Sequence, residues 1–217
     1  MRLDLALRFG LMLLTLAVPA QTVPPYKDAS LPVERRVADL LARMTLEEKV
    51  AQTLAVWQQK RELVDANGTF DASKAAPILQ HGIGQITRPS DGVDRGGRRR
   101  GPRETVELVN AIQRWVIEHT RLGIPVMFHE EALHGLAAVR GTNFPVPIGL
   151  ASTWDTALVE RVFTVAAREA RARGSQQVLS PVLDLARDPR WGRTEETYGE
   201  DPHLTSEIGL AAIRGYQ

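Results

Sequence analysis

The sequence of residues 102–128 is PRETVELVNAIQRWVIEHTRLGIPVMF, and it predicts a helix followed directly by a buried strand. Pro102 suits the first turn of a helix, and Gly123 is typical of a helix end. The apolar residues between them recur at helical spacing and predict one buried helix face: Val106, Val109, Ile112 and Val116. The run 124–128 then predicts a strand buried on both faces, which is typical of a parallel sheet.

The same alternation of apolar runs and helical patterns extends along most of the chain. The strand candidates are the short runs 83–86, 124–128, 148–151 and 178–182. Strands separated by helices predict βα units and a parallel sheet. An open doubly wound sheet and a TIM-type barrel both fit this pattern. Residues 81–84 lack the third glycine of a dinucleotide-binding turn, so we favour the barrel. We expect an α/β fold that forms roughly the first half of a TIM-type (β/α)8 barrel, with function in the loops after the strands.

Three helix starts are marked by capping residues. Thr45 with Glu48 fits a capping box, and the helix after it is expected to run from Leu46 towards Val56. Residues 152–155 also fit a capping box. Asp201 followed by Pro202 predicts a third start, with Asp as the cap and Pro at the first helical position.

The N-terminus resembles an export signal. Arg2 and Arg8 precede the apolar run 9–18, which is shorter than the roughly 20 residues that a membrane-spanning helix needs. We expect a signal peptide at 1–20, a linker at 21–30 and the barrel domain at 31–217, with secreted or periplasmic localisation. A buried N-terminal helix is the alternative for the first segment.

Composition limits the classes of partner. The chain has 217 residues, of which 43% are apolar, and its 27 basic and 26 acidic residues give a net charge of +1. This balance does not call for nucleic acid or an acidic membrane surface as a partner, so we interpret the arginine-rich segment 95–103 as a solvated loop. The chain has no cysteine, which excludes disulfides and thiolate metal sites.

Two loops that follow strand candidates are dense in charge. They are residues 129–135, HEEALHG, and 184–196, DLARDPRWGRTEE. Carboxylates, arginines and aromatic rings suit a carbohydrate, whose hydroxyls bind charged groups and whose C–H face packs on a ring. A zinc-peptidase site is an alternative, but His129 and His134 are five residues apart, which turns the second about 140° away on a helix. Asp188 is expected to pair with Arg187 or Arg190.

Tryptophans divide between core and loop. Trp57 and Trp115 follow helical stripes and are expected in the core. Trp191 lies in the second charged loop, where packing and lining of a site are both open.

At these loops the chain resembles glycoside hydrolase family 3, the β-glucosidase and β-xylosidase group. The segments that carry the resemblance are LPVERRVADLL (31–41), MTLEEKVAQ (44–52), EALHG (131–135), FPVPIG (144–149), SPVLDLARDPRWGR (180–193) and GEDP (199–202). The run DPRWGR followed by GEDP is the most specific of them. The resemblance implies retaining, exo-acting hydrolysis of terminal β-linked sugars without a cofactor, on an oligosaccharide or β-glycoside.

The resemblance also implies roles for particular residues. Glu131 matches the carboxylate that binds ring hydroxyls, and Arg193 matches the arginine that grips the terminal sugar. His134, Trp191 and Glu196 match supporting positions. The nucleophilic Asp and the acid–base Glu of the family are expected beyond Gln217, so we expect no turnover by this chain alone. A non-catalytic or degenerate carbohydrate-binding module is the alternative function.

Overall fold

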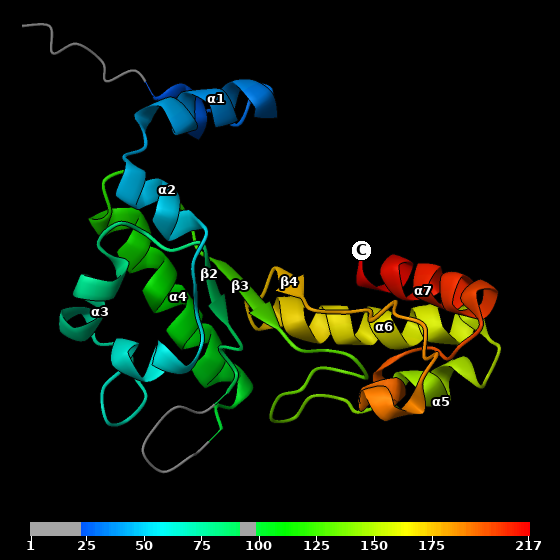
Figure 1. Cartoon of the computed structure of the whole chain (residues 1–217). Coiled ribbons are helices and arrows are strands. Elements are labelled where there is room, and N and C mark those ends of the chain that lie inside the picture. Colours follow the sequence, from blue (N-terminus) through cyan, green and yellow to red (C-terminus); the bar gives the residue numbers. More distant parts are fainter. Residues whose placement is uncertain (1–22, 92–98) are drawn as a thin grey trace, which may run out of the picture. The chain divides into compact units, whose positions relative to one another are not determined.

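The computed structural model describes residues 23–91 and 99–217, which form two compact units that meet between Arg43 and Met44 (Figure 1). The signal peptide expected at 1–20 lies outside the described residues. In the first unit, Pro25–Lys27 form the 3-10 helix η1 inside the segment expected to be a linker, and α1 spans Val33–Arg43. An ion pair of 2.8 Å joins Arg43 to Asp39 on α1.

The second unit is built on a four-stranded parallel sheet. Its strands are β1 (Ala55–Val56), β2 (Gln85–Thr87), β3 (Met127–Glu130) and β4 (Gln177–Val178), in the spatial order β1-β2-β3-β4. Each strand pairs with the next one along the chain, and all pairs are parallel. This α/β arrangement, with successive parallel strands as neighbours, is that of part of a (β/α) barrel.

Helices connect the strands. They are α2 (Leu46–Gln52), η2 (Gln58–Leu63), α3 (Ala72–Leu79), α4 (Pro102–His119), α5 (Pro147–Ala151), α6 (Thr156–Ala172), η3 (Pro189–Trp191), η4 (Thr194–Glu196) and α7 (Pro202–Tyr216). Figure 1 shows α6 and α7 lying side by side, and they make the most extensive contact between helices among the described residues. In the part of the chain that is described, no helix combines the length and the apolar character needed to cross a bilayer.

Two apolar cores hold these elements together. The first lies between β2, β3, α3 and α4 and includes Ile86, Phe128 and the predicted face of α4, of which Val109, Ile112 and Val116 are buried. The second lies between α5, α6 and α7 and includes Phe163 and Ile208. Burial of each such side chain stabilises the fold by about 1.5–3 kcal/mol.

Helix starts follow local hydrogen bonding, and two of the three predicted starts are confirmed. Thr45 Oγ1 accepts from the backbone N–H of Glu48, whose carboxylate accepts in return from the Thr45 N–H at 2.9 Å. Asp201 accepts from the Leu204 N–H at 2.7 Å and caps α7. The capping box at 152–155 is wrong, because Asp155 caps α6 by accepting from the Leu158 N–H.

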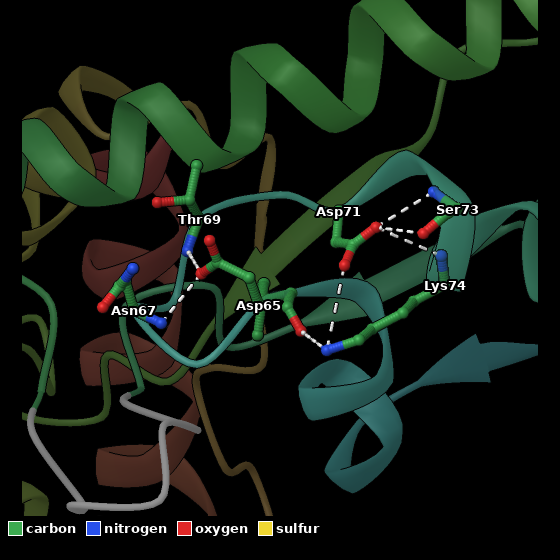
Figure 2. Close-up of polar contacts among 7 residues, drawn as sticks. Asp65, Asn67, Thr69, Asp71, Ser73 and Lys74 are labelled. Atoms are coloured by element: carbon green, nitrogen blue, oxygen red, sulfur yellow. Dashed lines mark hydrogen bonds and ion pairs between the residues drawn. The ribbon is translucent and has the colours of Figure 1, made fainter.

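The chain between η2 and α3 is ordered by two aspartates (Figure 2). Asp65 accepts from the backbone N–H groups of Asn67 and Thr69, at 2.8 and 3.0 Å, and so holds a tight turn. Asp71 accepts from the N–H of Ser73 at 3.0 Å and caps α3. These carboxylates satisfy backbone donors at a turn and at a helix start.

Several predicted elements need correction, among them two strands and one helix. The run 148–151 belongs to helix α5, because Pro147 takes the first helical position and a four-residue apolar run has no distinctive period. The strand expected at 124–128 begins only at Met127, since Pro125 has no N–H for a ladder. The helix expected to reach Val56 ends at Gln52, and Ala55–Val56 form the unpredicted strand β1.

Candidate functional site

The charged loops converge at the carboxyl edge of the sheet. Arg88 follows β2, Glu131 follows β3, and the segment that leaves β4 carries Arg193. Glu131 and Arg193 are 62 positions apart in number, yet their charges interact: burial raises the pKa of Glu131, the charge of Arg193 partly opposes that rise, and Glu131 adds to the rise in the pKa of Arg193 that Glu196 mainly causes. The loops after β3 and β4 therefore come near enough for these two charges to interact.

Arg193 is held by an ion pair within its own loop. Its Nε and Nη2 donate to the two carboxylate oxygens of Glu196, at 3.0 and 2.5 Å. This bonding raises the pKa of Arg193 and lowers that of Glu196. The guanidinium carbon lies 5.9 Å from the centre of the Trp191 ring. Arg193 and Trp191 are both exposed, so the loop presents a cation beside an aromatic face.

Glu131 has a different environment from that of an ordinary surface glutamate. Its residue is partly buried, and this burial raises the pKa of the carboxyl. The positive charge of Arg88 opposes this rise in pKa more strongly than that of Arg193 does. The negative charges of Glu196 and Asp91 raise the pKa of Glu131 further. Glu131 is thus an acceptor with limited hydration, on which the charges of two guanidiniums act.

The loop that carries Glu131 and His134 is fixed by its backbone. The Ala137 N–H donates to the Glu131 carbonyl at 2.9 Å, and the Phe144 N–H donates to the His134 carbonyl at 2.8 Å. Gly135 has a φ of 103°, and a Cβ there would lie 1.9 Å from the Thr142 carbonyl oxygen. The His134 Nδ1 is buried and, among the described residues, has no hydrogen-bond partner.

Several charged residues beneath the site were missed or misplaced by sequence reasoning. His129 and Glu130 end β3 and are buried, so assigning them to the loop is wrong. Lys60 of η2 is also buried, which lowers its pKa to about 8, and its Nζ donates to the Arg88 carbonyl at 2.6 Å. Glu130 accepts from the Ser90 N–H at 2.8 Å, while burial raises its pKa.

Two side predictions are settled by the structure. The ion pair of Asp188 is with Arg190, at 2.6 Å. Trp57 is 51% exposed and follows β1, so its placement in the core is wrong, whereas Trp115 packs against the first core. In the described ranges, no three His, Asp or Glu side chains are grouped as a metal ion would need.

A parallel sheet whose strands are paired in chain order, with charged loops at its carboxyl edge, is typical of the (β/α) barrel class. Residues 45–217 match the glycosyl hydrolase family 3 N terminal domain, and the chain belongs to this family. A putative beta-xylosidase of Formosa agariphila is 39% identical over 88% of this chain and 25% of its own length.

Solved structures agree with this assignment. A β-glucosidase from Erythrobacter marinus has a TM-score of 0.74 and 39% identity over 88% of this chain and 24% of that one. A β-glucosidase from Listeria innocua, solved in complex with glucose, has a TM-score of 0.65 and 33% identity over 85% of this chain and 24% of that one. The chain therefore spans about a quarter of the length of these relatives.

Proposed function

We propose that this chain holds the terminal sugar of a β-linked glycoside at the carboxyl edge of its sheet. The observation that carries the proposal is that Glu131 and Arg193, which come from the loops after β3 and β4, act on each other electrostatically at one edge of the sheet. A carboxylate accepts from sugar hydroxyls and a planar guanidinium donates to them, so the pair can orient one ring. Trp191, 5.9 Å from the Arg193 guanidinium, offers a face to the C–H side of the ring.

The remaining predicted residues support this pair. Glu196 keeps the Arg193 guanidinium in one plane through its two hydrogen bonds. His134 lies in the loop that positions Glu131. Fixing the ring in this way supplies part of the rate of a glycosidase, and contacts to ring hydroxyls that tighten in the transition state add several kcal/mol.

For the whole protein we propose retaining exo-hydrolysis of terminal β-linked sugars, of the β-glucosidase or β-xylosidase kind. The names of the relatives support this reaction, and the glucose complex of the Listeria innocua β-glucosidase supports a monosaccharide ligand. The reaction needs two carboxyl groups about 5–5.5 Å apart. Residues 1–217 supply no match to the family's Lys-His pair, so we expect this chain to bind sugar without cleaving it.

We further propose that residues 1–20 are a signal peptide and that the protein works outside the cytoplasm. The charged start and the apolar run at 9–18 support this. Relatives from Dickeya chrysanthemi and Salmonella typhimurium are named periplasmic. N-terminal sequencing of the protein recovered from culture fluid or periplasm tests it, and a mature protein that still begins at Met1 contradicts it.

The sugar proposal is tested by binding. The probes are methyl β-D-glucopyranoside and methyl β-D-xylopyranoside, with dissociation constants from ligand-observed NMR. Glu131→Gln and Arg193→Met should each weaken binding by about tenfold or more, since each removes charge-assisted hydrogen bonds. Arg161→Met, at an exposed arginine of α6, is the matched control and should bind as the unchanged chain does.

Equal affinity of all four proteins would contradict the proposal. Turnover is measured on aryl β-glucosides and β-xylosides. Hydrolysis by this chain that disappears in Arg193→Ala would overturn the expectation of binding without cleavage.

A further inference from the structure

A strained turn closes the carboxyl end of β2 beside the candidate site. Arg88 has a φ of 48°, in the left-handed region that residues other than glycine seldom adopt. Such a conformation persists only where the surroundings hold it, and strained residues of this kind cluster at functional sites. The turn runs from Arg88 to Asp91, whose N–H donates to the Arg88 carbonyl at 3.0 Å.

Three hydrogen bonds to two elements, η2 and β3, anchor this turn. The buried Lys60 of η2 donates to the Arg88 carbonyl at 2.6 Å. The Arg88 N–H donates to the carbonyl of His129 on β3 at 2.6 Å, and the Ser90 N–H donates to the buried Glu130 carboxylate at 2.8 Å. The sheet edge is therefore built to keep Arg88 in a conformation that costs free energy.

The register of the sheet sets where Arg88 lies. Thr87 pairs with His129, so Arg88 is level with Glu130 and adjacent to the start of the loop that carries Glu131. The Nε of Arg88 forms an ion pair with Asp91 at 2.9 Å, and the side chain is 29% exposed. Within the described residues, the structure gives its two terminal nitrogens no hydrogen-bond partner. Arg88 and Glu131 thus follow neighbouring strands at the same edge of the sheet, and the charge of Arg88 opposes the burial-raised pKa of Glu131 more strongly than the charge of Arg193 does.

We propose that Arg88 is a further sugar-contacting residue, which donates hydrogen bonds to ring hydroxyls beside Glu131. The proposal rests on the sugar-binding function proposed above and extends it to the loop after β2. Asp91 holds the guanidinium through Nε and leaves the planar Nη pair for the ligand, which is the geometry that suits paired hydroxyls. The alternative is that Arg88 only stabilises its own turn by pairing with Asp91.

The variant Arg88→Asn distinguishes a role of Arg88 in sugar binding from a role in stabilising its own turn. Asparagine tolerates the left-handed region better than arginine does, so the turn should keep its shape while the guanidinium is lost. Arg88→Lys keeps the charge but not the planar pair of donors. Arg161→Met is the control for loss of an exposed arginine. Binding of methyl β-D-xylopyranoside and methyl β-D-glucopyranoside is measured by ligand-observed NMR, and the pKa of the Glu131 carboxyl by carbon-detected NMR titration.

We expect Arg88→Asn to unfold at the temperature of the unchanged chain or above it, to bind both probes about tenfold more weakly or worse, and to raise the pKa of Glu131. Arg88→Lys should return the pKa of Glu131 towards that of the unchanged chain and recover only part of the affinity. Unchanged affinity in Arg88→Asn, with binding lost in Arg193→Met, would overturn this inference and leave the sugar site standing. A chain that binds neither probe would overturn the proposed function and this inference with it.

Discussion

At the scale of single residues, Gly135 is the backbone position that the candidate site depends on most directly. Its φ of 103° disfavours any side chain, and an added Cβ would lie 1.9 Å from the Thr142 carbonyl oxygen. Gly192 also has a positive φ, 84°, but a Cβ there would meet nothing within 4 Å. The two glycines therefore separate the cost of a left-handed backbone from the cost of a steric clash.

We predict that Gly135→Ala lowers the free energy of unfolding by more than Gly192→Ala does. The latter should cost about 1–2 kcal/mol, which is the penalty of the left-handed region alone. The clash in Gly135→Ala adds to a similar penalty, because the loop backbone must move. Urea denaturation with a common slope measures both. Equal losses of unfolding free energy in the two variants would show that the loop at Thr142 moves to accommodate the added Cβ without cost.

Lys60 makes stability depend on pH in a defined direction. Burial lowers its pKa from 10.5 to about 8 in the folded chain. Below about pH 8 the lysine is charged in both states, and the fold carries the full cost of burying that charge. Between the two pKa values the unfolded chain binds more protons, so the free energy of unfolding should rise with pH.

The expected slope is at most about 1.4 kcal/mol per pH unit for one proton. Lys60→Met should remove it, whereas Lys49→Met, at an exposed lysine of α2, should retain it. Denaturation at pH values between about 8 and 10 measures the slope. Burial raises the pKa values of Tyr198 and Tyr216 in the folded chain, so ionisation of the unfolded tyrosines near pH 10 lowers the free energy of unfolding, and the slope of Lys60 is read in the lower part of this window. If Lys60→Met shows the same dependence of unfolding free energy on pH, that dependence belongs to another titrating group.

At the scale of elements, sequence patterns predicted the long helices well and the short strands poorly. The stripe on α4 and the Asp201 cap of α7 carry local signals, a repeated apolar spacing and a side-chain acceptor, and both were confirmed. Strand β1 has two residues, Ala55–Val56, and therefore no period to detect. Its identity comes from pairing with β2, which is a tertiary interaction. The missed charged residues share this cause, since Lys60 and Arg88 follow the strands β1 and β2.

One element reaches the candidate site from the other end of the second unit. Tyr216, the last residue of α7, donates its hydroxyl to the Ala132 carbonyl at 2.7 Å, directly after Glu131. Tyr216→Phe should lower the free energy of unfolding by about 1 kcal/mol and weaken sugar binding, because the loop loses an anchor. Tyr198→Phe is the control: its hydroxyl is buried and, in the described ranges, has no partner, so its removal should be neutral or stabilising. Thermal unfolding measures the change in stability, and the binding assay measures the change in sugar affinity. Equal effects of Tyr216→Phe and Tyr198→Phe would contradict a role of the Tyr216 hydroxyl in anchoring the loop.

At the scale of the whole molecule, the balanced net charge of +1 contrasts with the sheet edge, where carboxyl groups outnumber guanidiniums among the described groups that act on Glu131 and Arg193. Besides the Glu131 carboxyl itself, those of Glu196, Asp91 and Asp184 interact with Glu131 or with Arg193. The guanidiniums in this group are those of Arg88 and Arg193. Each guanidinium already has a carboxylate partner. The edge therefore suits neutral sugars better than sugar acids.

We predict that methyl β-D-glucuronide binds at least about tenfold more weakly than methyl β-D-glucopyranoside at neutral pH, because its carboxylate meets charges of the same sign. The difference should shrink as salt is raised, since exposed charges are screened beyond about 10 Å at 0.1 M ionic strength. Glu196→Gln removes one of the repelling charges and should narrow the gap, while Glu160→Gln, on the exposed side of α6, should leave it unchanged. Ligand-observed NMR of the two glycosides with the three proteins gives the ratios. A glucuronide that binds as tightly as the glucoside in the unchanged chain would mean that the guanidiniums, and not the carboxylates, set the potential at this edge.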